Sequence, residues 1–441
     1  MHLGKVAVLD LTHGGAVIAR KLRSIAELVV AVDVYKTLDQ KALSDLEKEG
    51  ISVSQVAVDT KDFDLIIAPI HLDPKYPMLL EAAKNNIPVH FHHSAVGNLL
   101  SYYDLQDKTI IEITGTKAKT STALVLAHML SKKKKVVSHT SRGVEDWSTG
   151  RLINRLSITP ASILTVMDIL RKEAIDADVL IFEVSLGGTG CADLGVITTI
   201  YQDYAIANNT KMASEAKQSM ILNAKHGSTL VINNNVGFEA RKNVNIVSFC
   251  EDVNPSCNVY YDARTIAYHI GKRYGRISIP EATEYDIDSY RTAFTCATAV
   301  ALAFGMQEYL IKQGIQEFRG IEGRMKKTYI EGRILIDNSN SGMNISDAEK
   351  ALQFAKSLGK KIVMVLGEES KQVCEGLEPD KVKNFIDHHL HTLHALILVG
   401  ERYAFVHENI YYTHSLSEGI ELAKEMADEK DIILSCVKCF R

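Results

Sequence analysis

The chain has 441 residues, enough for about three domains of average size. Its 50 basic and 54 acidic side chains give a formal net charge of -4, which excludes the strong basic excess of a dedicated nucleic-acid binder. Hydrophobic residues make up 46% of the chain, yet no apolar run reaches the roughly 18 residues that a membrane span needs. Seven scattered cysteines and the lack of a signal-peptide pattern indicate a reduced, cytoplasmic protein rather than a disulfide framework.

The first hundred residues alternate between strand-like and helix-like segments. An amphipathic stretch over residues 16–22 predicts a helix between the first two strands. Short apolar runs predict strands at Val6–Leu9, Leu28–Val32, Leu65–Ala68 and Val89–Phe91. Alternation of this kind predicts a parallel, doubly wound sheet with a Rossmann-like architecture.

A second block begins at Thr109. It opens with a predicted strand at Ile110–Ile113, a loop at Gly115–Ser121 and a helix at Thr122–Leu130. The lysine run after that helix is interpreted as a solvated helix end, since cations complement the dipole there. Further segments predict strands at Val179–Val184, Val196–Ile200 and Thr229–Ile232 and an alanine-rich helix at Phe294–Phe304.

A third block starts near Gly320. Its apolar runs predict strands at Ile334–Ile336, Ile362–Leu366, Ala395–Val399 and Asp431–Leu434, with helices between them. The fold class is therefore α/β, with three consecutive α/β domains. We expect them at residues 1–107, 108–318 and 319–441.

The segment IEITGTKAKTS, Ile111–Ser121, predicts a phosphate-binding loop between a strand and a helix. Backbone N–H groups at a helix N-terminus concentrate positive potential, a lysine neutralises the β- and γ-phosphates, and a hydroxyl ligates Mg²⁺. The segment departs from the general Walker A pattern, because the loop is short and Ala118 precedes Lys119 where a glycine is usual. If that position needs a positive φ, alanine costs about 1–2 kcal/mol. The alternative is an ordinary strand-to-helix turn.

Together with motifs further along, this short loop resembles the P-loop of the Mur ligase family. These ATP-dependent enzymes activate a carboxylate as an acyl phosphate. The resemblance covers roughly Thr109 to Arg441, and the ordered set of matches is more specific than any single motif. In chain order the matches are Thr159-Pro160, Glu183 in EVSLGGTG, Asp193–Ile200, Lys217 in AKQSMI, Asn233–Asn235, Gly323-Arg324, Asp337 in LIDNSNSGMN, Val365–Glu368 and Val437-Lys438.

The resemblance implies roles for the site residues. ATP would be bound by Arg324, by Asp337 through the ribose hydroxyls, and by the P-loop. The P-loop residues are Gly115, Thr116, Lys117, Ala118, Lys119, Thr120 and Ser121. Mg²⁺ would be held by Thr120 and Glu183, and the catalytic residues would be Lys119, Glu183 and Lys217. Lys217 falls where many members carry a lysine carbamylated by CO₂, which would make it an anionic metal ligand; the alternative is a surface lysine on a helix.

The chain also departs from the family pattern in two places. The family's Asp-His pair reads Asp203-Tyr204, so the histidine that helps to hold a second Mg²⁺ is missing. The His-Asn pair that contacts adenine is absent, and Ser289–Arg291 lies nearby instead. No adenine contact is therefore carried over, and a second metal site is left open.

The N-terminal domain should select the substrate. DLTHGG, Asp10–Gly15, places backbone N–H groups at a strand-to-helix turn, where they could hold a substrate carboxylate. The alternative is a tight turn that needs glycine. The candidate substrate-binding residues are Thr12, His13, Gly14 and Gly15. His71, His90, His92 and His93 lie near other strand ends, where such sheets bind ligands, although each alone is more often structural.

DLTHGG, EVSLGGTG, the Asp-Tyr pair and DNSNSGMN together resemble a methanogen branch of the Mur ligases that forms coenzyme F-430, a nickel tetrapyrrole. That resemblance implies that ATP activates a propionate of a seco-precursor and that a carbon nucleophile of the same molecule closes a six-membered ring. Nickel would enter only within the small-molecule tetrapyrrole substrate, and neither nucleic acid nor membrane is an expected partner. An amide-forming Mur-type ligase and a non-catalytic nucleotide-binding protein remain alternatives, and the oligomeric state is not predicted.

Two further features are typical of metal sites. Cys436 and Cys439 form a lone CxxC with no second pair at zinc-site spacing. His391 and His394 are predicted on one face of a helix that also carries His388 and His389, and solvated helix residues are the preferred interpretation.

Overall fold

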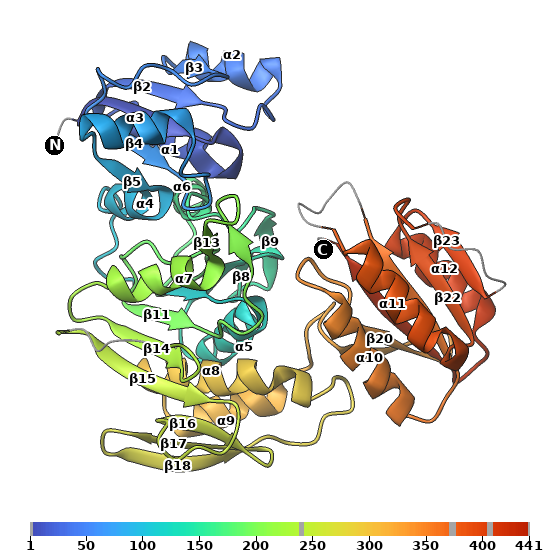
Figure 1. The fold of residues 1–441 in the computed structure, drawn as a ribbon. Helices are drawn as coiled ribbons and strands as arrows, with labels where there is room; N and C mark the ends of the chain where they lie inside the picture. Colours follow the sequence, from blue (N-terminus) through green and yellow to red (C-terminus); the bar gives the residue numbers. More distant parts are fainter. Residues whose placement is uncertain (1–2, 238–241, 370–375, 404–408, 440–441) are drawn as a thin grey trace. The chain divides into compact units, whose positions relative to one another are not determined.

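A computed structural model describes residues 3–237, 242–369, 376–403 and 409–439 (Figure 1). The chain divides into two compact units, Met1–Ser278 with Thr292–Ile315, and Ile279–Arg291 with Gln316–Arg441. The domain boundaries expected after residues 107 and 318 stay predictions. Among the described residues, no helix is long and apolar enough to cross a membrane.

The N-terminal part of the first unit is a parallel sheet with the strand order β3-β2-β1-β4-β5. Its strands are β1 (Leu3–Leu9), β2 (Ala26–Val32), β3 (Ser52–Ser54), β4 (Leu65–Ala68) and β5 (Val89–Phe91). Its helices are α1 (Ala16–Leu22), α2 (Gln40–Lys48), α3 (Pro77–Asn85) and α4 (His92–Leu100). Val6 and Val8 pack with α1, α2 and α4, whereas Ala7 and Leu9 on the other face of β1 pack with α3. The predicted doubly wound sheet is confirmed.

The central sheet has the strand order β18-β17-β16-β15-β14-β11-β6-β10-β7-β8-β9. The strands are β6 (Thr109–Thr114), β7 (Val136–Thr140), β8 (Gly143–Asp146), β9 (Arg151–Asn154), β10 (Val179–Glu183), β11 (Leu194–Ile197), β14 (Thr229–Asn233), β15 (Asn245–Cys250), β16 (Val259–Asp262), β17 (Thr265–Ile270) and β18 (Arg273–Ser278). Pairing is parallel from β16 to β7 and antiparallel at both margins. The strand that carries the P-loop, β6, therefore lies inside the parallel region.

Helices and one small hairpin complete the first unit. The helices are α5 (Lys119–Leu130), α6 (Ser162–Lys172), α7 (Ala213–Leu222), α8 (Arg291–Ala303) and α9 (Glu308–Glu317), and the hairpin is β12 (Ala205–Ile206) with β13 (Lys211–Met212). The apolar side chains of α6 share one buried cluster with those of α1 and α4. Lys21 on α1 also forms an ion pair of 2.6 Å with Asp168 on α6. Helices α1 and α4 of the N-terminal part thus pack against α6 of the central part within a single unit.

The second unit holds a sheet with the order β19-β20-β24-β21-β22-β23. Its strands are β19 (Lys326–Ile330), β20 (Arg333–Asp337), β21 (Ile362–Glu368), β22 (Ala395–Val399), β23 (Ile410–Thr413) and β24 (Ile432–Lys438), and only β19 pairs antiparallel. Helices α10 (Ile345–Ser357) and α11 (Pro379–His389) pack on one face and α12 (Leu416–Met426) on the other. This is the third α/β sheet that the sequence predicts.

Several predicted element limits differ from the structure, and three of these errors have a local structural reason. Residues 119–121, predicted as loop, form the first turn of α5, because Ala118 already caps the helix. The strand predicted at Val196–Ile200 ends at Ile197, and beyond it the Thr199 carbonyl accepts a hydrogen bond from the P-loop. Among the C-terminal histidines, α11 ends at His389; His391 lies in a short 3-10 turn and His394 follows it, so these two do not share a helix face.

The cysteines differ from the expectation of a wholly reduced chain. Cys250 and Cys257 form a disulfide. Cys250 ends β15 and Cys257 shortly precedes the adjacent strand β16, which places their Cα atoms 6.1 Å apart, within the range that a disulfide spans. The other described cysteines, which form no disulfide, are Cys191, Cys296, Cys436 and Cys439, and Cys374 lies outside the described residues.

Candidate active site

The P-loop begins at the carboxyl end of β6 and is hydrogen-bonded to the segment that follows β11. Gly115 has a φ of 145°, and a Cβ there would lie 2.0 Å from the Thr198 hydroxyl, so only glycine fits. The Thr116 N–H donates to the Thr199 carbonyl at 2.7 Å, and the Thr198 hydroxyl donates to the Lys117 carbonyl at 2.6 Å. The loop is therefore held by a segment more than 80 residues away in the chain.

Ala118 is the strained residue of this loop. Its φ of 62° and ψ of 5° lie in the left-handed region, at the N-cap of α5. The position thus has the positive φ at which an alanine is strained, and the alanine costs about 1–2 kcal/mol relative to an unstrained backbone. Such strain persists where surrounding structure enforces it, as at ligand sites. The helix that begins at Lys119 then points its N-terminus toward the loop.

Three residues predicted for phosphate and Mg²⁺ binding come together beside the P-loop. The Thr120 hydroxyl donates to Glu183 Oε2 at 2.8 Å. Glu183 ends β10, only 3% of it is exposed, and its Oε1 lies 3.9 Å from Lys119 Nζ. A hydroxyl and a carboxylate are oxygen ligands that suit Mg²⁺, and the adjacent ammonium suits phosphate. These side chains therefore fit a magnesium–nucleotide complex.

Lys217 is buried, so the surface-lysine alternative is wrong. Only 1% of the residue is exposed. Its Nζ on α7 lies 3.4 Å from the Tyr204 hydroxyl and 3.5 Å from the Ala213 carbonyl. Burial is the main cause that lowers the pKa of Lys217 to about 7, the positive charge of Lys119 adds to it, and Asp203 opposes it. A lysine in this setting is partly neutral at neutral pH.

The Asp-Tyr pair that departs from the family pattern joins the turn after β11 to α7. Asp203 Oδ1 accepts the N–H groups of Tyr204 and Ser214, each at 2.9 Å. Burial raises the pKa of Asp203, but the hydrogen bonds from Ser214 and Tyr204 outweigh it and hold the pKa below its usual value. The phenol of Tyr204, 42% exposed, covers Lys217 with its ring centroid 4.7 Å from Nζ.

In the second unit, Asp337 organises the turn that carries the Gly-Arg pair. Its Oδ2 accepts the Gly323 N–H at 2.9 Å, and its Oδ1 accepts the Ser435 hydroxyl at 3.0 Å. Gly323 has a φ of 74°, and Arg324 Nη1 donates to the Asn340 side-chain oxygen at 2.7 Å. The nucleotide-binding roles of Arg324 and Asp337 stay predictions, and a structural role for Asp337 is visible beside them.

In the turn after β1, two of the backbone N–H groups are already hydrogen-bonded to a side chain of the same turn. Asp10 has a φ of 65°, and its Oδ1 accepts the N–H groups of Thr12 at 3.1 Å and His13 at 3.3 Å. A Cβ on Gly14 or Gly15 would lie 2.6 Å or 2.2 Å from the nearest atom. The tight-turn interpretation accounts for both glycines, and the substrate-binding role of this turn stays a prediction.

Two of the N-terminal histidines have structural partners. His92 and His93 begin α4, and their Nε2 atoms bond the carbonyl oxygens of Leu9 at 3.0 Å and Ser185 at 2.8 Å. Burial lowers the pKa of each to about 4, so both are neutral near pH 7. His90 on β5 is exposed.

Sequence reasoning missed one residue at the phosphate site. The Ser141 hydroxyl lies 3.1 Å from the Thr120 hydroxyl, and its N–H donates to Glu183 Oε2 at 3.1 Å. Ser141 directly follows β7, the neighbour of β10 in the sheet. No strand was predicted at residues 136–140, so sequence reasoning had no signal for Ser141; the structure places it beyond the carboxyl end of a parallel strand, where ligands bind in such sheets.

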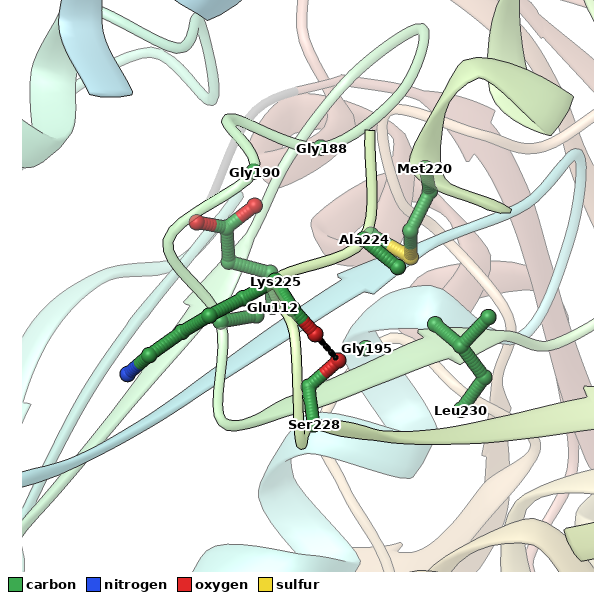
Figure 2. Close-up of a pocket in the computed structure, with 10 residues that line it drawn as sticks. Glu112, Gly188, Gly190, Gly195, Met220, Ala224, Lys225, Ser228 and Leu230 are labelled. Carbon is green, nitrogen blue, oxygen red and sulfur yellow. Dashed lines mark hydrogen bonds between the residues drawn. The ribbon is translucent and has the colours of Figure 1, made fainter. Parts of the chain in front are cut away.

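A small pocket lies on a different part of the central sheet. Its walls include Glu112 on β6, Gly195 on β11 and Met220 on α7, and the Ser228 hydroxyl closes one side by donating to the Lys225 carbonyl at 2.5 Å (Figure 2). None of the residues predicted for the active site lines it.

The chain is similar to known proteins over its whole length. The family described as coenzyme F430 synthetase CfbE, C-terminal domain, matches residues 327–439. Coenzyme F(430) synthetase of Methanosarcina acetivorans is 46% identical over 467 aligned positions, which cover 99% of each chain. The protein of the same name from Methanocaldococcus jannaschii is 25% identical and is aligned over 86% of this chain and 87% of its own.

The fold is similar to solved structures as well. MurF from Acinetobacter baumannii superposes with a TM-score of 0.56 at 15% identity, over 88% of this chain and 92% of that one. At so low an identity the match concerns the fold alone, and the fold it indicates is that of the Mur ligases.

Proposed function

Because the chain belongs to the coenzyme F430 synthetases, ATP-dependent ligases with the Mur ligase fold, we propose that it activates a propionate of a nickel seco-tetrapyrrole and closes a carbocyclic ring. ATP would phosphorylate the carboxylate, giving an acyl phosphate and ADP. A carbon nucleophile of the same molecule would then attack the acyl carbon. The new C–C bond forms as the C–O bond to phosphate breaks, and the carbon nucleophile gives up its proton.

The single observation that carries the proposal is the cluster of Lys119, Thr120 and Glu183. A free carboxylate is a poor electrophile, so the reaction needs a group that stabilises charge on the transferred phosphoryl oxygens. Lys119 would neutralise those oxygens, while Thr120 and Glu183 would hold Mg²⁺. A bound Mg²⁺ would supply further neutralisation of the phosphate charge.

Lys217 is proposed to act as a carbamate. Only a neutral amine adds to CO₂, and burial together with Lys119 lowers the pKa of Lys217 into the range where neutral amine is present. The resulting carbamate would be an anionic oxygen ligand on α7, near Lys119 of the proposed phosphate site. Tyr204 would then face a carbamate rather than an amine.

The absence of an amine co-substrate follows from this chemistry. In amide-forming relatives the acyl phosphate is attacked by an incoming nitrogen nucleophile, whereas a carbon nucleophile of the substrate itself needs no second organic molecule. The turn at residues 10–15 and the first sheet, which precede the ATP-binding segments, would bind the tetrapyrrole.

The test uses the full-length protein with ATP, Mg²⁺ and the nickel seco-precursor, and follows the absorption spectrum together with phosphate release. We expect a spectral change accompanied by one phosphate per ring closed, with no added amine. An Ala substitution of Lys119 is the matched control, and it should abolish both signals. Phosphate release that depends on an added amino acid would favour an amide-forming ligase and contradict the proposal.

A further inference from the structure

The N-terminal sheet brings three residues with metal-binding side chains to its topological switch point. Its strand order reverses between β1 and β4, which pair in parallel. Asp10 directly follows β1, and His71 follows β4 by a few residues. Crevices at such reversals, beyond the carboxyl ends of the strands, are where open α/β sheets bind ligands. His13 joins the group from the turn that Asp10 begins.

The ligand atoms converge on one carboxylate oxygen. His13 Nδ1 lies 2.8 Å and His71 Nε2 lies 3.4 Å from Asp10 Oδ2. All three ligand atoms lie within 4.8 Å of one another. Distances between ligands around a tetrahedral zinc-type ion are about 3.4 Å, as expected for metal–ligand bonds near 2.1 Å. Small side-chain movements would therefore place one ion among the three.

Asp10 is held in the orientation that this requires. Its other oxygen, Oδ1, accepts backbone N–H groups from Thr12 and His13, which directs Oδ2 toward the two imidazoles. Hydrogen bonds of this kind orient ligating carboxylates in metal sites. Asp10 is also completely buried, and a buried carboxylate is costly unless it is paired or coordinates a cation.

The Nε2 atom of His71 has no hydrogen bond within the described chain, although it lies 3.4 Å from Asp10 Oδ2. This atom is buried, and it faces the carboxylate without meeting the geometry of a hydrogen bond. The rings of His13 and His71 are nearly perpendicular, with centroids 4.8 Å apart, and Tyr35 stands edge-on to His13. A purely structural Asp–His pair would account for His13 but not for a second imidazole turned toward the same oxygen.

We propose that Asp10, His13 and His71 bind one divalent transition-metal ion, separate from the Mg²⁺ of the ATP site and from the nickel of the substrate. Two neutral imidazoles and one carboxylate suit Zn²⁺, Co²⁺, Ni²⁺ or Fe²⁺ far better than Mg²⁺. Three protein ligands leave a coordination position open to water or to a carboxylate of a bound molecule. The site lies in the sheet proposed to bind substrate, so this position could receive a substrate carboxylate.

The experiment titrates the metal-free, full-length protein with Co²⁺ in the absence of ATP and tetrapyrrole. Co²⁺ bound by imidazole and carboxylate in low-coordinate geometry absorbs in the visible range, and we expect the band to saturate at one equivalent. The same titration in Glu183→Gln removes any contribution of the proposed Mg²⁺ site and should leave the band unchanged.

Two variants identify the ligands. His71→Gln and His13→Gln should each weaken Co²⁺ binding at least about 10-fold, since even partners of ligands cost that much. His90→Gln on β5, an exposed histidine of the same sheet, is the matched control and should bind as the unmodified protein does. Circular dichroism of each variant reports whether it folds.

Three outcomes would overturn the proposal: no saturable band in the unmodified protein, a band that survives in both folded histidine variants, or a band lost only in Glu183→Gln. The first two would leave Asp10, His13 and His71 as a hydrogen-bonded cluster that supports the turn. Because neither ATP nor substrate is present, failure of ring closure and failure of this metal site are separately visible.

Discussion

The side-chain nitrogen of Lys217 lies 3.4 Å from the hydroxyl of Tyr204 and 4.7 Å from the centroid of its ring. The phenol thus stands between the amine and solvent, and it occupies the place where the family pattern has a histidine. An enclosed amine near the cation of Lys119 loses much of its preference for the protonated form. The predictions below begin from this pair.

Replacement of Lys217 by Ala should lower kcat at least about 10-fold, because it removes a metal-orienting anion. Short carboxylic acids added to Lys217→Ala should restore part of the activity by occupying the space of the carbamate. The measurement is phosphate release against acid concentration. Lys225→Ala, at an exposed lysine beyond the end of α7, should keep its activity and gain nothing from the acids. A complete lack of rescue would count against the carbamate.

Stability should rise with pH between about 7 and 10 because of Lys217. The folded pKa is lowered to about 7 from the usual 10.5, so in this interval the unfolded chain binds the proton that the folded chain has lost. The free energy of unfolding then rises with pH, by up to about 1.4 kcal/mol per pH unit. In CO₂-free buffer, Lys217→Met should lack this rise in urea unfolding at pH 7, 8 and 9. Parallel curves for the two proteins would exclude the lowered pKa.

Ala118→Gly should stabilise the protein. Glycine adopts a φ of 62° without strain, which recovers about 1–2 kcal/mol, while the freer unfolded chain takes back about 0.5–1 kcal/mol. We therefore expect a net gain of roughly 0.5–1 kcal/mol in thermal unfolding. Ala127→Gly, in the helical interior of α5, is the control and should destabilise the protein by about 1 kcal/mol or more. Equal losses in both variants would show that the left-handed conformation is not strained.

Glu183→Gln should reduce Mg²⁺-dependent phosphate release at least about 10-fold and raise the Mg²⁺ concentration needed for half-maximal activity. The amide keeps the shape that accepts the Thr120 hydroxyl but loses the charge that attracts the ion. Titrating Mg²⁺ at saturating ATP measures the shift. Chelation of Mg²⁺ should abolish activity in both proteins, and an unchanged Mg²⁺ requirement in the variant would remove Glu183 from the metal site.

Asp337→Asn separates nucleotide binding from support of the turn. If Asp337 holds the ribose, the KM for ATP should rise roughly 10-fold or more, the equivalent of a hydrogen bond to a charged group. Ser435→Ala removes one hydrogen bond to Asp337 and leaves its charge, so it should lower stability by about 1 kcal/mol without changing that KM. A lower melting temperature with an unchanged KM in Asp337→Asn would assign the residue to structure alone.

Much of the fold could be predicted because most of the parallel strands are buried and appear in the sequence as apolar runs, although the edge strand β5 is exposed. The strands at Leu65–Ala68, Val89–Phe91 and Ala395–Val399 are found with the predicted limits. Errors fall where a loop competes with a regular element: β11 ends at Ile197 so that Thr198 can hold the P-loop. No local pattern records such a competition between segments distant in the chain.

The candidate site divides in the same way. Sequence by itself determined the P-loop and its departure at Ala118, because these depend on short spacings within one strand–loop–helix unit; Glu183, more than 60 residues further along, was assigned only through the family resemblance. Only the tertiary structure decided that Lys217 is buried beneath Tyr204. It alone also decided that His13 and His71 both lie beside the same carboxylate oxygen of Asp10. Burial and the convergence of ligands depend on which strands become neighbours, and strand order arises from the packing of the whole sheet rather than from any local segment.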